Sequence, residues 1–134
     1  MKKTLLLSLL LLISLMVQAQ NEITIDGKVA NVKDGLVVSL FRRDGRVGST
    51  IAKDTIENGR FHFKVKPEKE LDKLSLFVHS TDFPSMSREV YASPNAHIQV
   101  NGKDNLIYTW EVKSNVKEQK ESDRYLYAAK DLWI

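Results

Sequence analysis

Asn58-Gly59 lies between two stretches of alternating apolar and polar residues, and this pattern constrains the fold more than any other feature of the chain. After the turn, Phe61, Phe63 and Val65 alternate with polar residues. Alternation with a period of two is typical of a strand with one buried face. Asn and Gly both tolerate the positive φ angles of a tight turn. Residues 53–65 therefore predict two antiparallel strands joined by a hairpin.

Two registers are compatible with this hairpin. A two-residue type I′ turn buries Ile56 opposite Phe61, but it also places Asp54 opposite Phe63. A three-residue turn with a glycine bulge instead places Asp54 opposite His62, on a shared polar face, and exposes Ile56. A slip of one residue exchanges the buried and exposed faces of a strand. We favour the bulged turn, because it separates the Asp54 carboxylate from the aromatic face.

Similar short segments recur along the chain, with turn signals between them. The stretch 36–43 has apolar residues on both faces, which predicts a central strand covered on both sides. In residues 23–29 a bend or bulge is expected at Gly27. Strands are predicted at residues 23–29, 36–43, 51–56, 60–65, 74–78, 88–92, 97–100 and 106–112. This spacing predicts a mainly β fold, an antiparallel β-sandwich or open barrel of seven to eight short strands, in residues 20–113.

From Ser114 the pattern changes to that of one C-terminal α-helix, in residues 114–134. The segment has no Gly or Pro, and Ser114 or Ser122 is placed to cap a helix. Its apolar residues at helical spacing either pack on the domain itself or contact a second domain or a partner. The candidate partner-binding residues, which would also serve a homo-oligomer, are Tyr125, Leu126, Leu132 and Trp133.

The N-terminus predicts export. Lys2 and Lys3 precede an apolar run from Leu5 to Val17, and a small-residue cleavage pattern ends at Ala19. These features are typical of a secretory signal peptide, residues 1–19, with cleavage after Ala19 and a periplasmic or secreted product. The alternative is a retained membrane anchor, although the run is shorter than the roughly 20 residues that a span requires. With a signal peptide, contact with the membrane is limited to transient targeting.

Charge and cysteine content exclude several function classes. Removing Lys2 and Lys3 lowers the number of Lys and Arg residues from 20 to 18, against 17 Asp and Glu. A nearly neutral domain has no electrostatic footprint for nucleic acid. The chain has no cysteine, which excludes thiol oxidoreductase activity, iron–sulfur clusters, cysteine-ligated zinc and a lipoprotein anchor.

No motif for catalysis or for a cofactor is present. Neither a phosphate-binding glycine loop nor a G-x-S-x-G nucleophile motif occurs. Three histidines are present, His62, His79 and His97, and only His62 has a carboxylate, Asp54, on a predicted neighbouring strand. A metal site needs further convergent ligands, so no catalytic, metal or cofactor-binding residue is predicted and hydrolase activity is not expected.

Two groups of residues are candidates for ligand binding. Arg42, Arg43 and Arg46 surround a predicted turn and would attract an anion, unless they form only a charged hairpin tip. Tyr108 and Trp110 share one face of a predicted strand, where flat rings either stack on a sugar or pack in the core.

The order of these motifs carries a family resemblance. A first strand of the form I-x-G-x-V, at Ile25 to Val29, precedes the run D-T-I-x-N-G-x-F-x-F-K, at Asp54 to Lys64, and then a late strand, a second Asn-Gly turn and a polar helix. This order resembles the domain-of-unknown-function family 4369, over roughly residues 23–127. The resemblance implies the N-terminal β-domain of secreted thioredoxin-like proteins from Bacteroidetes-type bacteria. Here no thioredoxin domain with its Cys-x-x-Cys pair follows, so the resemblance implies an accessory domain and no catalytic residue.

Together these features predict an exported, non-catalytic accessory or binding domain that acts through protein interaction in the periplasm or cell envelope. The alternative is a small-ligand or glycan-binding module that uses Tyr108, Trp110 and the tip from Arg42 to Arg46.

Overall fold

The computed structural model describes residues 4, 7–8, 21–83 and 86–128. The predicted signal peptide therefore lies almost entirely outside the described residues, and so do Leu132 and Trp133. Within the described part of the chain, no helix is long and apolar enough to cross a membrane.

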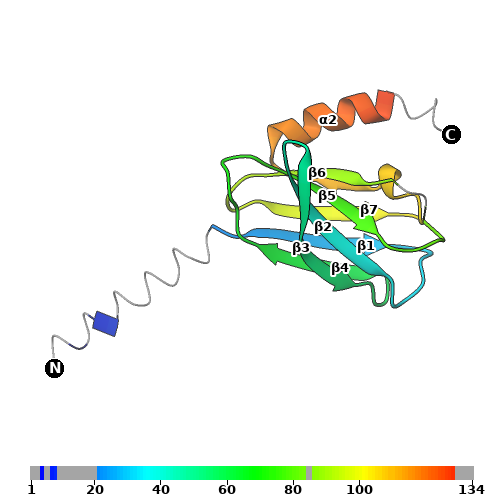
Figure 1. Cartoon of the computed structure of the whole chain (residues 1–134), viewed down its shortest axis with the longest axis horizontal. Coiled ribbons are helices and arrows are strands. Elements are labelled where there is room, and N and C mark those ends of the chain that lie inside the picture. Colours follow the sequence, from blue (N-terminus) through cyan, green and yellow to red (C-terminus); the bar gives the residue numbers. More distant parts are fainter. Residues whose placement is uncertain (1–3, 5–6, 9–20, 84–85, 129–134) are drawn as a thin grey trace.

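Two four-stranded sheets lie face to face (Figure 1). The first sheet has the order β4-β1-β7-β8, with the bounds Arg60–Val65, Ile23–Val29, His97–Gly102 and Glu111–Lys113. The second sheet has the order β3-β2-β5-β6, with the bounds Val47–Thr55, Val37–Asp44, Asp72–Val78 and Arg88–Ala92. A 3₁₀ turn, η1, spans Ile107–Thr109, and the helix α2 spans Lys117–Ala128 beside β6. The prediction of a mainly β sandwich with a C-terminal helix is confirmed.

Pairing within the sheets is antiparallel except at one place. β1 runs parallel to β7, with Ile25 beside Ile98, and antiparallel to β4, with Ile25 opposite Phe63. In the second sheet β2 lies between β3 and β5, as its apolar residues on both faces predicted. The first sheet is thus a mixed sheet whose central strands come from distant parts of the chain.

The core fills the space between the sheets with the inward residues of each strand. Alternation places every second residue inward, which is why the burial of β1 and β5 follows the apolar pattern of their sequences. The buried core residues of the strands are Ile23, Ile25, Val29, Val38, Leu40, Phe61, Phe63, Leu74, Leu76, Val78, Val90, Ala92, Ile98, Val100 and Val112. Ile56, Phe83, Ile107 and Trp110 close the core from the loops.

Aromatic rings cover two glycines in the first sheet. A Cβ on Gly27 would lie 2.1 Å from the ring of Phe61, and one on Gly102 would lie 2.5 Å from the ring of Trp110. The two rings stack with their centroids 6.0 Å apart. The bend or bulge predicted at Gly27 is wrong, because β1 keeps one continuous register with both neighbours. Gly27 instead makes room for a ring in the core.

The turn at Asn58-Gly59 has two residues, so our preference for a bulged turn is wrong. Glu57 and Arg60 exchange backbone hydrogen bonds of 2.9 and 3.1 Å across it, and Asn58 and Gly59 have φ angles of 52° and 73°. This turn buries Ile56 completely, which the bulged turn would expose. The strands then diverge, because β3 belongs to the second sheet and β4 to the first.

Two other sequence predictions are wrong. Residues 106–112 do not form a return strand: Leu106 to Trp110 are a loop containing η1, and only Glu111–Lys113 pair with β7. The third strand begins at Val47, four residues before the predicted start at Ile51.

Candidate functional site

Tyr108 and Trp110, the predicted sugar-stacking pair, do not share a strand face. Trp110 has an exposed fraction of 0 % and donates its indole N–H to the carbonyl of Asp104 at 2.9 Å. Tyr108 is half-buried within η1. A ring that lies wholly inside the core presents no face to a ligand, so Trp110 serves packing.

The three arginines of the predicted anion site are separated. Arg42 lies on the core side of β2, where it donates to the carbonyl of Lys66 at 2.8 Å and pairs with Glu68 at 3.3 Å and Asp72 at 3.4 Å. It closes one end of the sandwich. Arg43 and Arg46 are exposed. The structure does not bring the three guanidinium groups together on one site.

Within the described residues, helix α2 docks on the domain mainly through buried polar residues. Its buried positions are Gln119 and Asp123, four residues apart, preceded by Val116 just before the helix. Tyr125 is 82 % exposed and Leu126 is half-buried. Tyr125 is thus free to contact a partner. Leu132 and Trp133 cannot be placed with it, because they lie outside the described residues.

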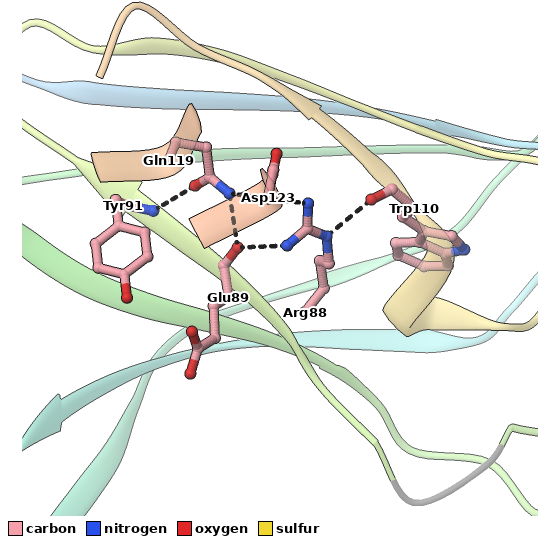
Figure 2. Close-up of polar contacts among 6 residues, drawn as sticks. All are labelled: Arg88, Glu89, Tyr91, Trp110, Gln119 and Asp123. Carbon is pink, nitrogen blue, oxygen red and sulfur yellow. Dashed lines mark hydrogen bonds and ion pairs between the residues drawn. The ribbon is translucent and has the colours of Figure 1, made fainter. Parts of the chain in front are cut away.

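A buried network joins α2 to strand β6 (Figure 2). Arg88 donates to Asp123 Oδ1 at 2.6 Å and to the carbonyl of Trp110 at 2.8 Å. Gln119 accepts the backbone N–H of Tyr91 at 2.7 Å and donates to the carbonyl of Glu89 at 3.3 Å. The Gln119 amide thus occupies the place of a neighbouring strand and caps the outer edge of β6.

Two other sheet edges are also blocked. At the edge of β4, the carboxylate of Asp54 accepts the backbone N–H of His62 at 2.7 Å. This N–H is therefore not available to pair with a strand of another chain. At the edge of β8, the strand has only three residues. Short edge strands and side chains at the edge are known devices that prevent pairing with other chains.

The edge of β3 has no such cap. Within the described residues, the backbone of Val47–Lys53 makes no hydrogen bond other than those of its ladder with β2. The stretch Val47–Ala52 carries no charge, and Val47 is 75 % exposed. A β-bulge at Ile51 interrupts the ladder, because Ala52 pairs with Leu40 while Thr50 pairs with the next residue of β2. The open edge is therefore the four-residue segment Val47–Thr50.

An apolar hollow of about 320 Å³ lies on the outer face of the same sheet. Phe41 and Phe77 are half-buried there and Met86 is exposed. The residues that line it are Phe41, Arg43, Ser75, Phe77, His79, Met86 and Ser87. Gly48 connects the hollow with the β3 edge, because a Cβ at Gly48 would lie 3.3 Å from the ring of Phe41.

Below this hollow, Ser39 Oγ and His79 Nε2 form a hydrogen bond of 2.8 Å. A serine paired with a histidine is also the arrangement of an activated nucleophile. Ser39 has an exposed fraction of 0 %, however, and no carboxylate bonds to His79 within the described residues. The bond satisfies a buried hydroxyl group under Phe77, whose ring meets that of His79 edge-on at 4.9 Å.

The outer face of the first sheet is polar and carries the other two histidines. Asp26 lies 2.6 Å from His62 and 3.6 Å from His97, each distance measured between a carboxylate oxygen and a ring nitrogen. Beside them lies a hollow of about 960 Å³. No group of three or more His, Asp or Glu residues within the described part of the chain has the geometry to hold a metal ion.

Sequence reasoning did not identify the β3 edge or either hollow. The sequence shows that Gly48–Thr50 carries no charge. It does not show which strand lies at the edge of a sheet, because that depends on where the chain crosses from one sheet to the other. The chain matches no protein-family model, no curated protein and no solved structure. The resemblance to family 4369 therefore stays a prediction.

Proposed function

We propose that the chain is an exported, non-catalytic binding domain whose partner is a protein that adds an extended segment to the edge of β3. This proposal rests on one observation: the edge of β3 is uncapped within the described residues. By contrast, Gln119 caps the edge of β6, Asp54 caps the edge of β4, and β8 is only three residues long. An uncapped edge invites pairing, and proteins that have no use for pairing block it. Export is supported by the N-terminal sequence.

Strand addition explains the form of this surface. Main-chain hydrogen bonds to Val47–Thr50 would supply affinity, and pockets for side chains would supply specificity. Gly48 leaves the ring of Phe41 accessible from the edge. A side chain of the partner strand beside Gly48 would therefore reach the apolar hollow between Phe41 and Phe77.

No observation favours the glycan-binding alternative at its predicted residues. Trp110 is buried, and Arg42 is held by Glu68 and Asp72. The buried Ser39 hydroxyl likewise supports a non-catalytic role, because a substrate could not reach it.

Site-specific photo-crosslinking in the exporting cell tests this function. A photoreactive residue at Ser49 should give a discrete protein adduct, and one at Lys113, on the β8 edge, should not. Changing Thr50 to Lys should abolish the Ser49 adduct, because a charge on an edge strand opposes pairing. The function is wrong if Ser49 gives no adduct, or if the Thr50→Lys change leaves the adduct unchanged in a folded protein.

A further inference from the structure

Two cations face each other on the outer face of the first sheet. Lys28 of β1 lies directly opposite Arg60 of β4 in the antiparallel register. Side chains that are directly opposite in such a pair have their Cβ atoms about 5 Å apart, and like charges at that separation destabilise the sheet. The arrangement therefore costs stability in the free protein.

Neither cation has a partner within the described residues. The structure gives no ion pair and no side-chain hydrogen bond for Lys28 or Arg60 there. Nearby carboxylates are engaged elsewhere: Asp26 bonds His62 at 2.6 Å, and Asp54 accepts the backbone N–H groups of Thr55 and His62 at 2.9 and 2.7 Å. The carboxylates of Asp26, Asp54 and Glu57 also line the hollow, but none of them forms an ion pair with Lys28 or Arg60.

Both cations line the polar hollow of about 960 Å³, which is at the upper end of the volumes typical of small-ligand sites. Asn101 lies beside Lys28, and Gln99 lies beside Asp26, on the parallel strand β7. The side-chain amide groups of Gln99 and Asn101 form no hydrogen bond with a described residue. Amide groups donate to and accept from hydroxyl groups, so the hollow offers neutral polar contacts next to the two cations.

We propose that this hollow binds a small hydroxylated ligand that carries a carboxylate or phosphate group, with that anionic group held between Lys28 and Arg60. The guanidinium fork of Arg60 matches the paired oxygens of either group, and Lys28 adds a point charge. Gln99 and Asn101 contact the hydroxyl groups. The anion replaces repulsion between the two cations with two favourable contacts. This site lies mainly on the first sheet and includes only the last two residues of β3, Asp54 and Thr55. It does not include the Val47–Thr50 edge, so it does not depend on the proposed protein partner.

Glu57 sharpens the test, because its carboxylate also lines the hollow and makes no ion pair with a described residue. It opposes an anion. Glu57→Gln should therefore strengthen anion binding, whereas a role for Glu57 in binding a cationic ligand would give the opposite result.

Titration of the protein followed by amide NMR tests the site, with glucuronate and glucose 6-phosphate as anionic probes and glucose as the neutral probe. At least one anionic probe should shift the amides of β1, β4 and β7 in a saturable way, and glucose should bind at least about tenfold more weakly. The two anionic probes also distinguish a carboxylate ligand from a phosphate ligand. Lys28→Gln and Arg60→Gln should each weaken binding at least about tenfold, as expected for the loss of a charge-assisted contact.

Lys113→Gln is the matched control, because Lys113 is an exposed lysine of the same sheet that does not line the hollow. It should leave binding unchanged. A second readout is thermal: without ligand, Lys28→Gln should raise Tm, since it removes a like-charge pair. The proposal is overturned if neither anionic probe binds saturably, if glucose binds equally well, or if Lys28→Gln and Lys113→Gln have the same effect on binding.

Discussion

The guanidinium group of Arg88 and the carboxylate of Asp123 lie 2.6 Å apart, with their side chains only 3 % and 11 % exposed. This ion pair joins an edge strand to the C-terminal helix, 35 residues later in the sequence. This charge pair and the hydrogen bonds of Gln119 link helix α2 to strand β6.

Removing the carboxylate of this pair should strongly destabilise the domain. Asp123→Ala leaves a buried guanidinium group without its counter-charge, and breaking a buried pair in this way costs about 3–5 kcal/mol. Urea unfolding measures the loss in the free energy of unfolding. Glu121→Ala is the control, because the pair of Glu121 with Lys117 is exposed and such pairs contribute at most about 1 kcal/mol. Equal losses for both variants would contradict a buried role for Asp123.

Loss of the Gln119 amide should open the edge of β6. Gln119→Leu keeps a similar volume but leaves the Tyr91 N–H without a partner and the Glu89 carbonyl with only its 3.4 Å bond from Arg88, at a cost of about 1–3 kcal/mol. Hydrogen exchange should show faster exchange at the Tyr91 amide. The exposed Lys120→Leu variant should leave that amide unchanged. Unaltered exchange at Tyr91 in Gln119→Leu would show that Gln119 is not the cap.

Gly27 should not tolerate a side chain. Gly27→Ala forces a methyl group into the ring of Phe61, and overpacking of this kind costs about 1–3 kcal/mol. The double variant with Phe61→Leu should lose less stability than the sum of the two single losses, because the smaller residue makes room. Additive losses in a double-mutant cycle would show that Gly27 is needed for another reason.

The ion pair of Lys73 with Glu89 should give a stability difference that disappears at alkaline pH. The hydrogen bond to Glu89, 3.2 Å away, raises the pKa of Lys73 above its usual 10.5, and the charges of Glu89 and Tyr91 add to this. A raised pKa in the folded state means that the stabilisation is complete below pH 10.5 and is lost as the pH rises through the folded-state pKa.

Lys73→Met should therefore lower the free energy of unfolding at pH 8 by at most about 1 kcal/mol, since both side chains are more than a third exposed. Above the folded-state pKa the variant and the parent protein should have the same stability. Chemical unfolding across that range measures the difference. A difference that does not change with pH would assign the effect of Lys73 to packing over the ring of Tyr91 instead.

The alternation of apolar residues was sufficient to predict the sandwich and most of its strands. Arg60–Val65 and Arg88–Ala92 form strands with the predicted bounds, because each is short and buries one face. Alternation does not determine which strands pair, and the parallel neighbours β1 and β7 could not be predicted from it. The apparent strand at 106–112 was misleading because Ile107 and Trp110 are buried from a loop.

The candidate sites were harder to predict for the same reason. Lys28 and Arg60 are 32 positions apart and meet only through the β1–β4 register, which the local hairpin pattern did not predict. Arg42 was assigned to the tip from its neighbours in sequence, whereas its position on the core side of β2 directs it to Asp72. Each of these sites depends on pairing between distant strands.

The parallel pairing of β1 with β7 also has a consequence for how the protein folds. The second sheet is complete once Ala92 has been synthesised, whereas β1 gains its second neighbour only when His97–Gly102 is available, more than 70 residues after β1 begins. Pairing between such distant segments is slow, because the intervening chain must lose entropy before the contacts form. Folding of the first sheet should therefore be the late, rate-limiting stage, which would suit the export that we propose for this chain.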